Sequence, residues 1–176
     1  SATRVDASQL IEKGRENLLL QSNQFDTTWT KDSGITLTSG QSGYDGSSDA
    51  WLLDKPAAAF RDISQTITYS GVTSYSVYAK SGSLSQMALR FVDGVSGHFA
   101  RFDLSSGSPL TSTGSVIEMK MTDVGGGWYR CEATANVSGV YVYIYADTET
   151  NTTAGNILIQ DAQLEQGLVA TPYIET

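Results

Sequence analysis

The chain is built of short segments in which apolar and polar residues alternate. Such alternation places apolar side chains on one face of a β-strand and polar side chains on the other. Turn-forming pairs separate the segments, among them Asp-Gly at 45–46 and 93–94 and Ser-Gly at 138–139. No window keeps a helical period for long, and the stretch KPAAAF at 55–60 predicts a loop or a single turn. The pattern therefore predicts an all-β protein.

About a dozen strands are expected, spaced near ten residues apart, which is typical of a sandwich or jelly roll. The predicted strands are Thr3–Val5 with Leu10–Glu12, Asn17–Gln21, Ile35–Thr38, Ala50–Leu53, Ile63–Tyr69, Ser74–Lys80, Met87–Asp93, His98–Leu104, Val116–Met121, Trp128–Val137, Val140–Ala146 and Asn156–Leu164. A last extended piece is expected at Leu168–Ile174. The segments Asn17–Trp29 and Gly155–Thr176 both alternate as half-buried strands. We expect these two ends to lie side by side in one domain, since an all-β sandwich of 176 residues is usually a single unit.

Charge narrows the range of partners. The chain carries 19 Asp and Glu against 11 Lys and Arg, a formal net charge of −8. Nucleic acid and anionic membranes both require a basic footprint, so we expect neither as a partner. Only 17% of the residues are charged, so Ser, Thr, Gly, Asn and Gln supply most of the polar surface and suit a neutral polar ligand. No window approaches 18 apolar residues, so no spanning segment is expected.

The residues that could perform catalysis form no recognisable arrangement. Any triad would have to use His98, the only histidine, and no nucleophile motif accompanies it, so a solvent-facing residue at a strand end is expected. The single cysteine, Cys131, excludes a disulfide framework and falls on an alternating strand, where a buried thiol is expected. Asp and Glu lie at turns and strand ends without a spacing that singles out a glycosidase pair. We therefore expect no enzymatic activity.

The aromatic residues carry the binding prediction. Tyr141, Tyr143 and Tyr145 alternate strictly with aliphatic residues, so the three rings share the face that turns away from the core. Tyr78 and Arg90 lie on the polar sides of two other predicted strands, and we expect them on the same sheet face. Flat rings stack on sugars, while Tyr hydroxyls and Arg bind sugar hydroxyl groups. The alternative is cross-strand aromatic packing that only stiffens the sheet, or burial of the rings under a loop.

Three stretches carry a family resemblance: NLLLQSNQFDTTW at Asn17–Trp29, GGWYRC at Gly126–Cys131, and the ending from AQLEQG to TPYIET. In this order they resemble the carbohydrate-binding-module-like jelly rolls of bacteriophage fibre, head-spike and tail proteins. The resemblance implies an antiparallel β-sandwich of jelly-roll type over residues 17–176. Residues 1–16 are more charged and predict a separate N-terminal arm or hairpin.

The resemblance also implies a structural calcium ion. In similar sugar-binding jelly rolls, a motif ending in an acidic residue follows the first strand, and the last strand supplies a second acidic residue. Asn23, Asp26 and Asp161 occupy the matching places here, and hard oxygen ligands suit Ca²⁺. The alternative is that Asp26 only begins an Asx-turn and Asp161 is a surface residue.

Taken with the resemblance, these features favour a non-catalytic adhesion module of a phage virion that binds glycans on the host surface or in mucus. The alternative is a structural fibre or capsid-decoration module that contacts other virion proteins and binds no sugar. Either role implies a virion or extracellular location, and fibre and spike proteins are commonly homotrimers, so we expect that state for this chain.

Overall fold

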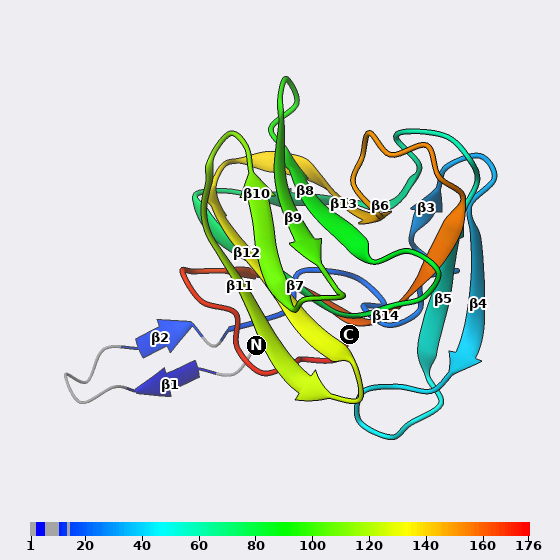
Figure 1. The fold of residues 1–176 in the computed structure, drawn as a ribbon. Coiled ribbons are helices and arrows are strands. Elements are labelled where there is room, and N and C mark those ends of the chain that lie inside the picture. The colour runs from blue at the N-terminus through cyan, green and yellow to red at the C-terminus, as the bar shows by residue number, and fades with distance from the viewer. Residues whose placement is uncertain (1–2, 6–10, 14) are drawn as a thin grey trace.

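The computed structural model describes residues 3–5, 11–13 and 15–176, and those residues form strands, turns and loops without an α-helix (Figure 1). Two six-stranded sheets and one two-stranded sheet account for the strands, and every pair of neighbouring strands is antiparallel. The all-β sandwich predicted from the sequence is confirmed. Within the described ranges there is accordingly no helix that could cross a bilayer.

Most strands match the predicted segments within a few residues. The strands are β1 (Thr3–Val5), β2 (Ile11–Lys13), β3 (Thr30–Lys31), β4 (Thr36–Gln41), β5 (Ala50–Lys55), β6 (Asp62–Tyr69), β7 (Val72–Ser81), β8 (Gln86–Val92), β9 (Gly97–Asp103), β10 (Ser108–Ser112), β11 (Val116–Gly125), β12 (Trp128–Asn136), β13 (Gly139–Ala146) and β14 (Gly155–Gln166). The sequence did not predict β3 and β10. The first has two residues, and the second is exposed throughout and contains Pro109.

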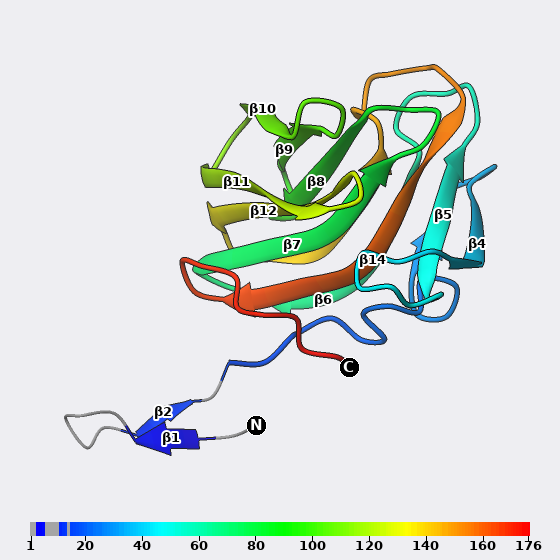
Figure 2. The ribbon, with the colours of Figure 1, turned by 60° about the horizontal axis from the view of Figure 1, so that its bottom comes forward.

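The two large sheets lie face to face as the layers of the sandwich (Figure 2). One has the strand order β10-β9-β8-β13-β6-β3 and is called the β13 sheet below; the other has the order β11-β12-β7-β14-β5-β4 and is called the β14 sheet. Several strands that follow one another in sequence belong to different sheets, including β5 and β6, β7 and β8, and β13 and β14. The chain therefore crosses repeatedly between layers, as a jelly roll requires.

The core between the sheets is filled by the apolar side of each alternating strand. From the β13 sheet, Phe91, Phe102 and Ile144 are fully buried, and from the β14 sheet Tyr75 and Leu164 meet them. Because side chains alternate along a strand, burying one side of β13 turns its tyrosines to the outside of the sandwich. The core thus fixes which residues can face a ligand.

The two ends of the sandwich domain lie side by side, as predicted, but they are not joined as two paired strands. The Leu18 amide donates to the Leu164 carbonyl at 2.8 Å, which joins the first segment to β14. The prediction that Asn17–Gln21 is a strand is wrong, because the segment is irregular. Here the Asn17 side chain, in place of a strand ladder, binds the backbone of β14 and of the chain ending. The last extended piece, Leu168–Ile174, likewise contains no strand.

Only part of the predicted N-terminal arm is described. Thr3–Val5 and Ile11–Lys13 pair as an antiparallel hairpin, with Arg4 opposite Glu12. In both views this hairpin stands apart from the two large sheets (Figures 1 and 2). The other residues of the predicted arm up to position 14 lie outside the described residues.

Candidate functional site

The strand β13 carries a row of tyrosines on the outer face of its sheet. It lies between β8 and β6, near the middle of the β13 sheet. The ring centroids of Tyr141 and Tyr143 are 6.3 Å apart, and those of Tyr143 and Tyr145 are also 6.3 Å apart, with the second pair tilted by only 26°. Tyr141 is 39% exposed, Tyr143 is partly buried, and Tyr145 is buried. The prediction that the rings share an outer face is consistent with this register, but only two of the three reach solvent.

Arg90 lies beside this row, as predicted, with its guanidinium held between two rings. Its Cζ lies 4.9 Å from the Tyr143 ring centroid and 5.0 Å from that of Phe99, and its Nη1 donates to the Tyr145 hydroxyl at 3.1 Å. The register explains the contact, because Tyr143, Arg90 and Phe99 are direct neighbours across β13, β8 and β9. Stacking on two aromatic faces holds a guanidinium in place and orders the rings around it. Arg90 thus stiffens the surface.

Phe99 is a member of this surface that the sequence reasoning missed. The alternation in the sequence HFARF could have identified it. Phe99 and Arg101 occupy the side of the strand opposite to Ala100 and Phe102, which are in the core. We call Tyr141, Tyr143, Phe99 and the guanidinium of Arg90 the aromatic platform.

A loop lies next to one end of the platform. Glu149, in the connection from β13 to β14, forms an ion pair with Arg101, and Arg101 in turn lies 5.1 Å from the centre of the Phe99 ring. Tyr145 is only 1% exposed at this end. At this end the exposed rings are therefore followed by a buried tyrosine and an ion pair.

A buried carboxyl group, that of Asp62, lies beside Tyr145 at the same end of the platform. Asp62 is opposite Tyr145 in the register and is almost fully buried. Burial raises the pKa of Asp62 to about 6, and repulsion by Asp32 adds to the rise. The hydrogen bond with Tyr145 and the charges of Arg90 and Arg61 act in the opposite direction. Burial also raises the pKa of Tyr145, so its hydroxyl stays protonated and can donate to Asp62.

The prediction that Tyr78 shares this face is wrong. Tyr78 lies on β7, which pairs with β12 and β14 in the other sheet, so its ring is on the opposite outer face of the sandwich. There it is covered by Tyr44, whose ring stacks on it at 3.7 Å with an angle of 4°. The Tyr44 hydroxyl donates to Asp161 Oδ2 at 2.9 Å, which fixes the covering loop.

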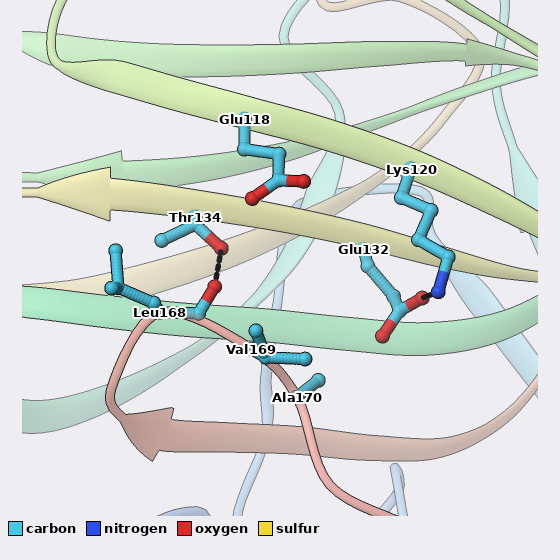
Figure 3. A pocket seen from close by; sticks show the side chains of 7 residues that line it. All are labelled: Glu118, Lys120, Glu132, Thr134, Leu168, Val169 and Ala170. Atoms are coloured by element: carbon cyan, nitrogen blue, oxygen red, sulfur yellow. Dashed lines mark hydrogen bonds and ion pairs between the residues drawn. The ribbon is translucent and has the colours of Figure 1, made fainter.

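The outer face of the β14 sheet has a cavity of about 310 Å³, away from Tyr78, under the chain that follows β14 (Figure 3). One wall consists of charged and polar side chains of β11 and β12, among them Glu118, Lys120 and Glu132, and the other consists of Leu168, Val169 and Ala170. In Figure 3 the carboxylates and the ammonium group lie across the cavity from the aliphatic wall. No predicted site residue lines this cavity.

The predicted calcium ligands are only partly brought together. Asn23 Oδ1 accepts the Asp161 amide at 3.1 Å, so these two residues are neighbours as predicted. Asp26 is exposed, and no hydrogen bond joins it to either of them in the described part of the chain. Burial raises the pKa of Asp161 to about 6, with repulsion by Asp49, Asp45 and Glu175 adding to the rise. Among the described residues no three His, Cys, Asp or Glu side chains are grouped to hold a metal ion. Calcium at Asn23, Asp26 and Asp161 stays a prediction.

His98 and Cys131 are both buried. The expectation that His98 faces solvent is wrong: it is 6% exposed, its Nδ1 accepts the Ser115 amide, and its Nε2 bonds to Asp93 at 3.2 Å. Both ring nitrogens therefore have partners, and the ring ties two loops together. Cys131 is fully buried, as expected, and burial raises the pKa of its thiol. Neither residue is placed to act as a nucleophile or base.

Comparison with known proteins identifies the fold. No family model matches the sequence, and no curated protein matches it. The C-terminal family 22 carbohydrate-binding module of Clostridium thermocellum Xyn10B aligns at a TM-score of 0.53 and 18% identity, over 88% of this chain and 96% of that one. The CBM22-1 xylan-binding domain of Paenibacillus barcinonensis Xyn10C aligns at 0.53 and 14% identity, over 89% and 99%.

A phage protein also aligns, less closely. The enzymatically active domain of bacteriophage CBA120 tailspike protein 4 gives a TM-score of 0.47 and 18% identity over 84% of this chain. The chain spans about a fifth of that protein, 21% of its length, and we draw no argument from a score below 0.5. The family 22 modules, matched along almost their whole length, show that this chain has the β-sandwich fold of a carbohydrate-binding module.

Proposed function

We propose that this protein is a non-catalytic module that binds glycans on the aromatic platform of the β13 sheet. The observation that carries the proposal is the pair of neighbouring, solvent-reaching rings Tyr141 and Tyr143, of which Tyr143 is held by the stacked guanidinium of Arg90. Flat rings held on a sheet can stack on the C–H faces of sugars, while tyrosine hydroxyls donate to and accept from sugar hydroxyls. The fold shared with xylan-binding modules supports this assignment.

The proposal includes no catalysis. Glycoside hydrolysis needs two carboxyl groups on either side of the scissile bond. On the β13 sheet, Asp62 is buried beside Tyr145, and Glu149 is paired with Arg101. Neither carboxyl group is presented to a sugar lying on the platform. Binding alone accounts for what this surface offers.

The setting that we propose is a phage virion, where the module would hold a fibre or spike to glycans on the host surface or in mucus, outside the cell. The sequence resemblance of Asn17–Trp29 and of the chain ending supports this setting. A site of weak affinity suits this setting, because many copies of the module on one particle bind with a much higher overall avidity.

The second candidate is a structural role in assembly with other virion proteins. The observation in its favour is the cavity in Figure 3 with the exposed aliphatic residues Leu168 and Val169 beside it, since exposed apolar surface commonly marks protein contacts. Light scattering, which gives the oligomeric state, together with a sugar-binding assay decides between the two candidate functions. A stable trimer that binds no sugar supports assembly, and a monomer that binds sugar supports adhesion.

We also propose that a calcium ion stabilises the loop region around Asn23 and Asp161. The contact between Asn23 and Asp161 supports this proposal. Burial is the main cause that raises the pKa of Asp161, and the charges of Asp49, Asp45 and Glu175 add to it, so a cation would relieve this repulsion. The ion would be structural and takes no part in glycan binding.

The binding proposal is tested by Tyr143→Ala on a multivalent glycan panel. Wild type should bind at least one neutral glycan weakly, in the micromolar-to-millimolar range, and Tyr143→Ala should weaken that binding about tenfold, from ~1 kcal/mol per stacked ring. Ile117→Ala, at a 56% exposed position of β11 on the β14 sheet, is the control and should bind normally. A silent panel with multivalent wild type, or equal binding by Tyr143→Ala, would refute the proposed site.

A further inference from the structure

Phe60 has a backbone conformation that its side chain disfavours. It lies in the connection between β5 and β6 and has a φ angle of 51°, in the left-handed region. Glycine and asparagine enter this region readily, whereas a bulky residue there is an outlier that the surrounding structure must hold in place. Backbone strain of this kind is concentrated at functional sites.

The side chain of Phe60 also contributes little to the packing of the core. It is 51% exposed and does not belong to the buried core. A polar residue tolerant of positive φ would avoid both the strain and the exposed ring. Folding alone therefore gives no reason for a phenylalanine at this position, and a contact made outside the fold would give one.

The position of Phe60 connects it to the aromatic platform. Its amide donates to the Glu149 carbonyl at 2.6 Å, and the Glu149 side chain pairs with Arg101, which lies against the Phe99 ring of the platform. The two connections that carry Phe60 and Glu149 lie together at one end of the sandwich (Figure 1). Asp147, in the second connection, also has a positive φ, of 81°.

The strand register gives the distance along the sheet between Tyr143 and Phe60. Asp62 and Ser64 pair with Tyr145 and Tyr143, so Phe60 precedes the cross-strand partner of Tyr143 by four residues. At about 3.3 Å per residue in extended chain, Phe60 lies up to roughly 13 Å beyond Tyr143, past the buried Tyr145. A glycan that contacts both must therefore be a chain of several sugar units.

We propose that Phe60 is a ligand-contacting residue that stacks against a sugar unit beyond those on Tyr141 and Tyr143, so that the site selects extended neutral oligosaccharides over short ones. This inference rests on the proposed function. It adds a specificity residue that lies outside the sheet and is presented by a strained loop.

The test compares Phe60→Asn with wild type on a long and a short oligosaccharide of the series that wild type binds, xylohexaose and xylobiose in the case of a xylan. Asparagine tolerates the positive φ, so Phe60→Asn should melt at the wild-type temperature or a few degrees above it. It should bind the long oligosaccharide about three- to tenfold more weakly and the short one equally. Phe60→Trp keeps a stacking ring and should retain the preference for length. Val95→Asn, at a 95% exposed position on the β8–β9 hairpin, is the control and should change neither.

Each outcome separates this inference from the proposed function. If Phe60→Asn binds both oligosaccharides as wild type does while Tyr143→Ala fails to bind, the inference is overturned and the platform stands. If Phe60→Asn lowers the melting temperature by many degrees, Phe60 is a structural residue and the inference is again overturned. If wild type binds no glycan, both fall together.

Discussion

Asn17 is expected to be the residue on which the closure of the sandwich depends most. Its Nδ2 donates to the carbonyls of Ala162 and Ile174, both at 3.0 Å, and its Oδ1 accepts the amides of Leu19 and Leu164 at 3.2 and 3.0 Å. One buried side chain thus uses its full capacity of two donors and two acceptor positions to join the start of the domain, β14 and the chain ending.

Replacing Asn17 with alanine removes four hydrogen bonds and leaves four backbone groups without partners. At about 1 kcal/mol for each bond, with some recovery by water entering the space, the loss should be about 3–4 kcal/mol of unfolding free energy. For a chain of this size that corresponds to a fall in melting temperature of roughly 8–12 °C. Asn17→Asp keeps the acceptors but loses both donors, so it should destabilise at neutral pH and recover partly in acid, where a protonated carboxyl can donate once.

Urea denaturation followed by tryptophan fluorescence and circular dichroism measures this loss. The control is Asn136→Ala, at an exposed position at the end of β12, which should change stability by less than about 0.5 kcal/mol. A loss below about 1 kcal/mol for Asn17→Ala would refute the reasoning, because it would show that the two ends are held by apolar packing alone.

Two further predictions concern the buried carboxyl groups and calcium. The pKa of Asp62 in the folded protein, about 6, exceeds its ordinary value of 3.8, so the folded state binds the proton more tightly and stability falls as pH rises from about 4 through 6. Asp62→Asn should therefore raise unfolding free energy by about 1–3 kcal/mol at pH 7 and flatten that pH dependence; lower stability at pH 7 would contradict the burial argument. If calcium binds near Asp161, a chelator should lower the melting temperature by several degrees and Asp161→Ala should reproduce the effect; a melt that neither treatment moves would end the calcium proposal.

Alternation along the strands was enough to predict the fold and the outward side of β13, because the core must take the aliphatic side. It did not predict which outward rings stay exposed. Tyr145 is buried, with Arg90 and Phe99 from the neighbouring strands against it, and contacts across strands carry no signal in the local sequence. Phe60 could be read from the sequence only as part of a loop, because loops carry no periodic signal.

The sequence also did not predict which strands belong to the same sheet. Tyr78 was expected on the same sheet face as Arg90 because both residues lie on the polar sides of their predicted strands. In this jelly roll the chain crosses to the other layer between β7 and β8, which places the two residues on opposite faces. Strand pairing of this kind depends on long-range packing, which local patterns do not contain.

The most direct test of the account is a nuclear magnetic resonance titration of the ¹⁵N-labelled protein with the glycan that binds best on the panel. We predict that the amide shifts concentrate around Tyr141, Tyr143, Arg90 and Phe99, on the outer face of β13, β8 and β9. Shifts concentrated instead on the outer face of the β14 sheet, around Tyr44 or the cavity of Figure 3, would contradict the central claim.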